Sequence, residues 1–158
     1  MPDNIIISDT SCFIVLTNIG ELELLHKTYR NITTTIEVST EFGQSLPAWV
    51  EIKAPSNKQL QQVLALQLDK GEASAIALAI EYPDSIIILD DYKARKVAEK
   101  LRLNITGTIG VIIKAKLRGV IKSVKPYLNK ISKTDFRLTP EIEQEALRQA
   151  GEYHYQEL

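Results

Sequence analysis

The sequence predicts an α/β fold in which a short, mostly parallel sheet is covered by helices on both faces. Two β-branched runs, Ile5–Ile7 and Ile86–Ile88, show no alternation of apolar and polar residues. Strands that are buried on both faces have this pattern, and parallel sheets contain such strands. Segments with helical apolar spacing separate these runs from weaker extended segments, and this alternation is typical of α/β proteins.

In the first half of the chain, short helices should follow each extended segment. The strand Ile5–Ile7 leads into Asp9-Thr10-Ser11 and then into an apolar helix that Gly20 ends. Two residue pairs, Thr34–Glu37 and Ser56–Gln59, have capping-box spacing and mark helix starts. The predicted helices cover residues 12–19, 21–29, 35–43 and 56–68, and the short extended segments cover 32–34 and 50–52.

In the second half, a small-residue helix over 73–80 precedes a turn at 82–84 and the second clear buried strand, Ser85–Leu89. A helix over 92–101, a short strand over 104–106 and a helix over 108–117 should follow. Pro140 suits the first position of a last helix, and one more helix is predicted near 126–132.

Length and composition indicate one globular domain. The chain has 158 residues, with 44% hydrophobic and 25% charged residues. We expect a single domain over 1–158, with an acid-site core over about 4–120 and C-terminal helices over about 121–158. Cys12 is the one cysteine, no secretory signal is visible and no apolar run approaches the ~20 residues of a membrane span. These features predict a cytoplasmic protein.

The net charge of −1 conceals an uneven distribution along the chain. Residues 1–92 contain 5 basic and 13 acidic residues, whereas residues 93–133 contain 12 basic residues and one acid, Glu99. Such a stretch can bind a polyanion beside an acid-rich site. It can equally be a solvated set of helix faces, because neighbours in sequence need not form a patch in space.

Acidic residues recur at strand ends and helix starts, and they are the candidate catalytic residues: Asp9, Glu41, Glu72, Asp90 and Asp91. Glu72 leads an apolar helical stripe, and a buried charge there requires a cation or a site edge. Each acid also has a simpler interpretation. Asp9 or Ser11 could cap a helix, Asp69 and Glu72 could form a capping box, Asp91 could be an N-cap, and Glu41 could be solvated.

Several carboxylates that crowd one sheet edge repel one another unless cations neutralise them. Oxygen ligands without nearby Cys or His favour Mg²⁺ or Mn²⁺, with Asp9, Glu72, Asp90 and Asp91 as the metal ligands. His26 and His154 should lie outside this cluster, on the surface. Such a metal site suits hydrolysis of phosphodiesters, since the metal activates water and stabilises charge on the phosphate.

At this point the chain resembles the PIN-domain nucleases, and in particular a prokaryotic PIN-like subgroup of unknown function that is similar to VapC-type toxins. The resemblance extends to about residue 140 and rests on segments at 9–11, 41–42, 69–73 and 88–95. It implies a three-layer α/β/α sandwich and a Mg²⁺- or Mn²⁺-dependent endoribonuclease. The acids above match the family's acids, although Glu72 replaces the Asp of many toxins and Asp90-Asp91 doubles another acid.

A toxin of this kind would be a homodimer paired with a small antitoxin protein. Two other functions stay open: a non-catalytic RNA- or protein-binding domain, and a DNA nuclease that acts on special structures. For an RNA substrate we expect phosphate contacts from basic residues beside the acids: Lys93, Arg95, Lys96, Lys114 and Lys116.

Overall fold

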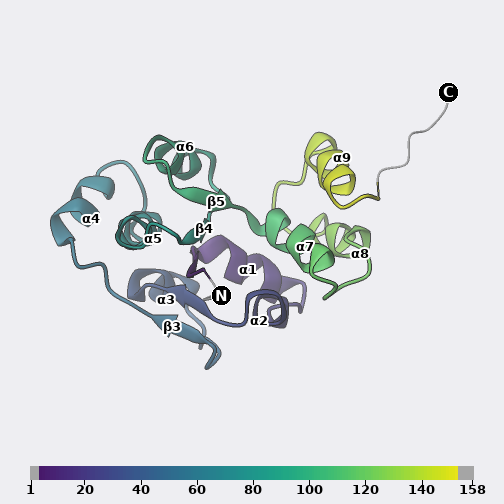
Figure 1. The fold of residues 1–158 in the computed structure, drawn as a ribbon, viewed down its shortest axis with the longest axis horizontal. Helices are drawn as coiled ribbons and strands as arrows, with labels where there is room; N and C mark the ends of the chain where they lie inside the picture. The colour runs from purple at the N-terminus through teal and green to yellow at the C-terminus, as the bar shows by residue number, and fades with distance from the viewer. Residues whose placement is uncertain (1–3, 153–158) are drawn as a thin grey trace.

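In the computed structural model, which describes residues 4–152, five parallel strands form one sheet in the order β3–β2–β1–β4–β5 (Figure 1). The strands are β1 (Ile6–Ser8), β2 (Ile32–Thr34), β3 (Val50–Ile52), β4 (Ile86–Ile88) and β5 (Asn104–Thr106). Because every pairing is parallel, the carboxyl ends of all five strands lie at one edge of the sheet.

Helices follow each strand, which confirms the predicted α/β/α arrangement. Those before β4 are α1 (Thr10–Asn18), α2 (Glu23–Tyr29), α3 (Ile36–Phe42), α4 (Lys58–Leu64) and α5 (Lys70–Glu81). Those after β4 are α6 (Tyr92–Lys100), α7 (Thr108–Leu117), α8 (Lys125–Ile131) and α9 (Pro140–Gln149). None of the helices within 4–152 is long and apolar enough to cross a membrane.

The isoleucine runs are buried on both faces of the sheet, as their pattern predicted. Ile7 and Ile87 pack with α4, α5 and α6, whereas Ile6 and Ile88 pack with α1, α2 and α3. Strand β1 supplies the centre of this core, and Ile6 and Ile7 pair in register with Ile86 and Ile87. The two hydrophobic clusters therefore share one sheet and hold its carboxyl edge in a fixed place.

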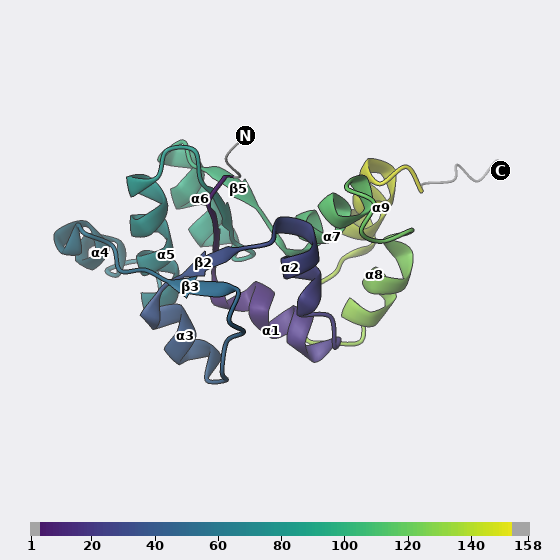
Figure 2. The same ribbon diagram turned by 60° about the horizontal axis from the view of Figure 1, so that its bottom comes forward.

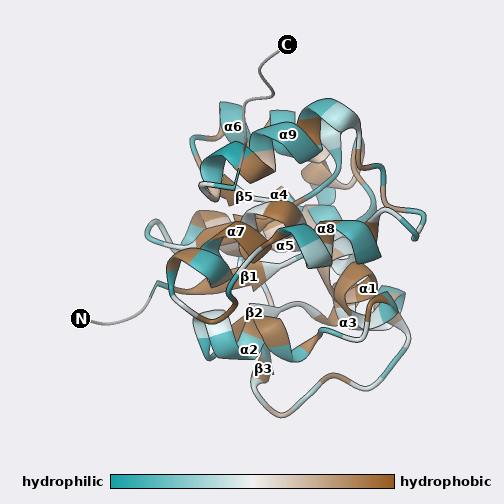
Figure 3. Ribbon diagram, turned by 90° about the vertical axis from the view of Figure 1, so that its right-hand side faces the viewer, coloured by the Kyte–Doolittle hydropathy of each residue, from teal (hydrophilic) through white to brown (hydrophobic). Residues whose placement is uncertain are grey.

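A third cluster joins α7, α8 and α9 on the side of the molecule away from α4 (Figures 1 and 2). Ile112, Leu128 and Ala146 represent the three helices in this cluster. Figure 3 shows apolar residues on β1 and α7 in the middle of the molecule and hydrophilic residues on the outer faces of α6 and α9. These C-terminal helices extend the core past β5, so that α9 lies beyond the edge of the sheet.

Two predicted helix starts are each wrong by one residue, for tertiary reasons. Thr35, not Thr34, caps α3, because its hydroxyl accepts from Val38 N at 3.2 Å. The Thr34 hydroxyl instead donates to Ser8 O at 2.7 Å and ties β2 to β1. Asn57, not Ser56, caps α4, and this helix ends at Leu64 rather than near Leu68.

Helix α5 begins three residues earlier than predicted. Asp69 caps it, accepting from Glu72 N at 2.8 Å, while the Glu72 carboxylate accepts from Asp69 N at 3.2 Å. This reciprocal pair is the capping box that the sequence spacing allowed. Gly71 and Glu72 are thereby placed in the first turn of a buried helix, at the carboxyl edge of the sheet.

Candidate functional site

Two of the predicted acids follow the two paired central strands. Asp9 comes directly after β1, and its backbone N–H donates to Ile88 O at the end of β4 at 3.1 Å. Asp90 follows β4 after one intervening residue, Leu89. Since β1 and β4 are parallel neighbours, both acids lie at the same edge of the sheet.

Asp9 is buried, and its side chain does not cap the helix that follows it. It occupies the N-cap position of α1 but makes no capping hydrogen bond, so the capping interpretation of Asp9 is wrong. Among the described residues, its Oδ1 atom has no hydrogen-bond partner. Burial, together with the negative charges of Glu72, Asp69 and Glu41, raises the pKa of Asp9 to about 8.

Gly71, in the first turn of α5, lies close to side-chain oxygens of three other residues. A Cβ on this residue would lie 2.8 Å from Glu41 Oε2, 3.3 Å from Thr10 Oγ1 and 3.4 Å from Asp9 Oδ1. Three oxygens from α1, α3 and the residue before α1 therefore surround one point beside the first turn of α5. Glu41 is exposed on α3, and desolvation and the Asp69 charge raise its pKa.

Glu72 is both a buried acid of the candidate site and part of a helix capping box, the two roles that its sequence position allowed. Its residue is 8% exposed, and it completes the capping box of α5. Burial and the neighbouring charges of Asp69 and Asp91 also raise its pKa, to about 7. The capping role holds the Glu72 carboxylate at the first turn of α5, where its charge raises the pKa of Asp9.

Asp90 and Asp91 have different surroundings although they are adjacent in sequence. Asp90 accepts hydrogen bonds from Ser11 Oγ at 2.7 Å, Thr108 Oγ1 at 2.6 Å and Thr108 N at 2.8 Å. Asp91 is exposed and caps α6, accepting from Ala94 N at 2.9 Å. Ser11 is therefore no helix cap but a link between α1 and Asp90.

A family model described as a PIN domain matches residues 5–152. The chain belongs to the PIN-domain family. No curated protein and no solved structure shows significant similarity to it. PIN domains are generally metal-dependent nucleases, which agrees with hard carboxylate oxygens gathered at one sheet edge.

The oxygen chemistry of this PIN domain fits a divalent cation. Within residues 4–152, no group of three His, Cys, Asp or Glu side chains already has the spacing of a metal site. However, the unpartnered Asp9 Oδ1 and the space beside Gly71 are features that a capping or ion-pair role leaves unexplained. Burial and neighbouring carboxylates raise the pKa values of Asp9, Glu41 and Glu72, and a bound cation would favour their charged forms.

The basic residues of this PIN domain divide into two groups. Lys93, Arg95 and Lys96 lie on α6, which begins directly after Asp91. Lys96 lies 3.7 Å from Glu99, and Arg95 Nη1 donates to Leu89 O at 2.7 Å beside Asp90. Lys93 is exposed and makes no ion pair with any described residue.

The expectation for Lys114 and Lys116 is wrong, because neither flanks the acids. Lys114 lines a hollow with Asn4, Ile86 and Asn104, which lie at the amino ends of three strands. Lys116 lies 2.9 Å from the Glu152 carboxylate and donates to Ala150 O at 2.5 Å. Helix α7 runs back from the acid edge, so its later residues lie toward the opposite edge.

The sequence analysis missed three residues that shape the site of this PIN domain. Asp69 was considered only as a cap, yet its charge raises the pKa of Asp9, Glu41 and Glu72. Ser11 and Thr108 hold Asp90, and only their positions after strand ends could have indicated this. His26 is half-buried, stacked on Trp49 with ring centroids 5.2 Å apart, and His154 lies outside the described residues.

Replacing Gly71 by alanine should weaken metal binding without unfolding the protein. The new methyl group would displace the Glu41 carboxylate, which is 2.8 Å away and flexible, and would fill the space beside Asp9. Alanine favours helix by up to ~1 kcal/mol over glycine, so we expect the unfolding midpoint to hold or rise. Isothermal titration with Mn²⁺ checks affinity and thermal unfolding in EDTA checks stability. Equal Mn²⁺ affinity in wild type and Gly71→Ala would contradict the placement of the ion near Gly71.

Proposed function

We propose that the protein is a metal-dependent endoribonuclease that hydrolyses RNA phosphodiesters with Mg²⁺ or Mn²⁺. The observation that carries this proposal is Asp9, a buried carboxylate with an unpartnered oxygen and a pKa raised to about 8, facing three further carboxylates. A fold does not retain such an arrangement for its own stability, because uncompensated buried charge is unfavourable. A cation would compensate it.

Asp9, Glu41 and Glu72 would hold the cation. The charge of Asp69 acts on all three carboxylates, and that of Asp91 acts on Glu72. When bound, a divalent metal lowers the pKa of a water ligand and stabilises charge on the phosphate. Asp90 has a positioning role, because three hydrogen bonds from Ser11 and Thr108 hold its carboxylate between β4 and the first turns of α1 and α7. Lys93 and Arg95 lie on α6, directly after Asp90 and Asp91, and would bind the phosphates of the substrate.

A nuclease assay with matched substrates tests the proposal. Single-stranded RNA and DNA of one sequence should be incubated with the protein in Mg²⁺, in Mn²⁺ and in EDTA. We expect internal cleavage of the RNA with either metal and none in EDTA. Cleavage of DNA but not RNA would favour the structure-specific DNA nuclease instead. No cleavage of either, together with RNA binding, would favour a non-catalytic domain.

The family resemblance extends the proposal to a cytoplasmic toxin that forms a homodimer and pairs with a small antitoxin. Induced expression in a bacterial host should then arrest growth, and co-expression of a neighbouring small reading frame should restore it. Growth arrest that persists in a cleavage-deficient variant would speak against toxicity through RNA cleavage.

RNA affinity should depend on salt through α6 and not through the lysines of α7. Each phosphate contact releases counterions, so Lys93→Ala and Arg95→Ala should each lower the log–log salt slope by about one. Lys116→Ala should leave the slope unchanged, because Lys116 is paired with Glu152. Lys27→Ala is a matched control, since Lys27 is exposed on α2 just before the amino end of β2. If Lys93→Ala and Arg95→Ala both had the same log–log salt slope as the unmutated protein, α6 would be excluded as the phosphate-binding surface.

A further inference from the structure

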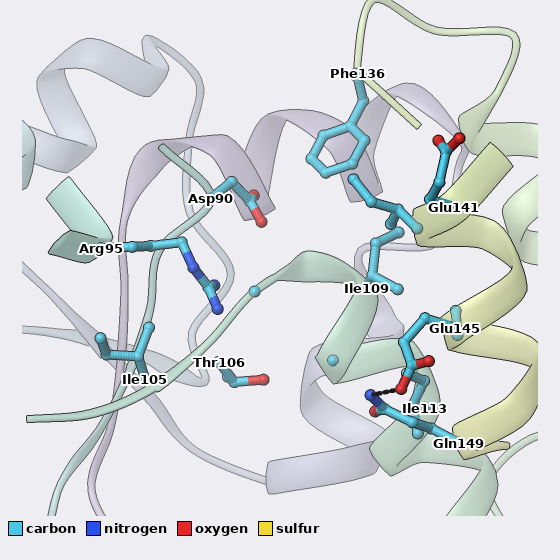
Figure 4. A pocket seen from close by; sticks show the side chains of 14 residues that line it. Asp90, Arg95, Ile105, Thr106, Ile109, Ile113, Phe136, Glu141, Glu145 and Gln149 are labelled. Carbon is cyan, nitrogen blue, oxygen red and sulfur yellow. Dashed lines mark hydrogen bonds between the residues drawn. The ribbon is translucent and has the colours of Figure 1, made fainter. Parts of the chain in front are cut away.

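A hollow of about 560 Å³ opens next to the acid site, between the corner that joins β5 to α7 and the inner face of α9. Asp90 and Arg95 line one end of this hollow, and Phe136 and α9 line the other (Figure 4). Its volume falls within the range of small-molecule sites. Nothing in the metal chemistry described above uses it.

The middle of the hollow is apolar and carries one aromatic ring. Phe136, Ile109 and Ile113 line this part, and Figure 4 shows the Phe136 ring directed toward it. Phe136 precedes α9 and is only half-buried, so one part of its ring is available to a ligand. A half-exposed aromatic ring above an aliphatic floor is the environment in which proteins stack nucleobases.

Hydrogen-bonding groups lie at both ends of the hollow, with cationic donors at one end and carboxylate acceptors at the other. The Arg95 guanidinium is fixed by its bond to Leu89 O, and its remaining N–H groups can bind an anion. On the α9 side, Glu145 accepts from Gln149 Nε2 at 3.2 Å and from Arg148 at 2.9 Å. These carboxylate oxygens can accept further hydrogen bonds from the N–H groups of a ligand.

We propose that this hollow binds one nucleobase of the RNA next to the scissile phosphate, with the base stacked on Phe136 and the adjoining phosphate on Arg95. The inference rests on the proposed ribonuclease function and adds a specificity site to it. A carboxylate can accept two parallel bonds from the N1–H and N2–H groups of guanine, so Glu145 favours guanine over the other bases. A basic peptide fits the acids of α9 but not the cation at the other end.

Continuity with the acid site supports this assignment. Asp90 lines the hollow and is bonded to Ser11, which lies two residues after Asp9 in the chain. An RNA strand that places one phosphate at Asp9 therefore brings a neighbouring nucleotide to the mouth of the hollow. Gly107 keeps this passage open, because a Cβ there would lie 2.9 Å from Asp90 Oδ1 and 3.1 Å from Arg95 Nη1.

Titration of the full chain with GMP, AMP, CMP and UMP in EDTA tests the proposal, with the isoleucine methyl signals followed by NMR. GMP should shift the signals of Ile109 and Ile113 and leave Ile36, which is exposed on α3, unchanged. The other nucleotides should bind several-fold more weakly. EDTA and uncleavable ligands separate this result from the proposed function: a protein that cleaves RNA but fails to bind GMP here refutes the inference alone.

Variants of the ring and of α9 locate the contact. Phe136→Leu should weaken GMP binding about tenfold, as expected for a lost stacking partner, while Phe136→Tyr should retain it. Glu145→Gln should remove the preference for guanine, and Glu143→Gln, on the same helix but outside the hollow, should not. Thermal unfolding checks that Phe136→Leu remains folded.

Three outcomes would overturn the proposal. The first is the absence of shifts at Ile109 and Ile113 with all four nucleotides. The second is equal affinity for the four nucleotides, which would mean that Glu145 does not select the base. The third is a shift of these methyl groups by a lysine-rich peptide and by none of the nucleotides, which would assign the hollow to a protein partner.

Discussion

Asp9→Asn should reduce RNA cleavage at least about 10³-fold while making the metal-free protein more stable. The loss of cleavage follows because a metal contributes several kcal/mol to the transition state and each 1.4 kcal/mol is about tenfold in rate. The gain in stability follows because one oxygen of the buried carboxylate lacks a hydrogen-bond partner and three like charges lie near it. The sign of the change in unfolding free energy therefore distinguishes a metal-site residue, whose replacement stabilises the metal-free protein, from a structural residue, whose replacement destabilises it.

Cleavage of a fluorescent RNA in Mn²⁺ and denaturant unfolding in EDTA measure the two effects. Asp84→Asn is the control, since Asp84 is exposed in the turn before β4 and should change neither quantity. A helix cap or a structural ion pair at position 9 would give the opposite stability result, with a loss of about 0.5–2 kcal/mol for a cap. An unfolding midpoint that falls in Asp9→Asn would therefore remove Asp9 from the proposed metal site.

The stability of the metal-free protein should decrease as the pH rises from about 4 to about 8. The pKa of Asp9 is about 8 in the folded protein, against ~3.9 in an unfolded chain. Between these values the folded state binds a proton that the unfolded state lacks, so stability is fully present at the acid end and is lost toward pH 8. Glu72, with a pKa of about 7, adds a smaller loss in the same direction.

Unfolding in EDTA at several pH values measures this dependence, and the difference between wild type and Asp9→Asn isolates the part due to Asp9. That difference should grow with pH and reach a few kcal/mol near pH 8, since one pKa unit corresponds to about 1.4 kcal/mol. Mn²⁺ should restore wild-type stability more at pH 8 than at pH 6, because protons compete with the metal for the same oxygens. A difference that stays constant across this range would contradict the raised pKa.

The positions of Asp9 and Asp90 could be predicted from sequence, because an uninterrupted isoleucine run fixes where a buried parallel strand ends. Parallel strands then bring their ends to one edge without any knowledge of side-chain packing. The displacement of Lys114 follows from the same logic, since six helical residues after Thr108 span about 9 Å away from that edge. The error lay in treating a charge-rich stretch of sequence as a patch in space.

Other features could not be obtained from spacing. Thr34 and Thr35 have the same capping chemistry, and only the bond from Thr34 to Ser8 O, which spans 26 residues, selects between them. The Asp69 carboxylate both caps α5 and raises the pKa of Asp9, and the sequence spacing indicated only the first of these roles. The hollow at Phe136 depends on how α9 packs against α7, and the sequence pattern of α9 alone shows only an amphipathic helix.

The strand order also determines when the site can exist during synthesis of the chain. Central strand β1 is made first, but its neighbour β4 pairs Ile6 with Ile86, 80 residues later. At about 5–20 residues per second, a ribosome takes roughly 4–16 s to make that interval. Asp9 is made at the start of that interval, whereas Glu72 is made near its end and Asp90 only after Ile86. The unfinished chain therefore lacks the complete acid cluster while it is still attached to the messenger RNA that encodes it.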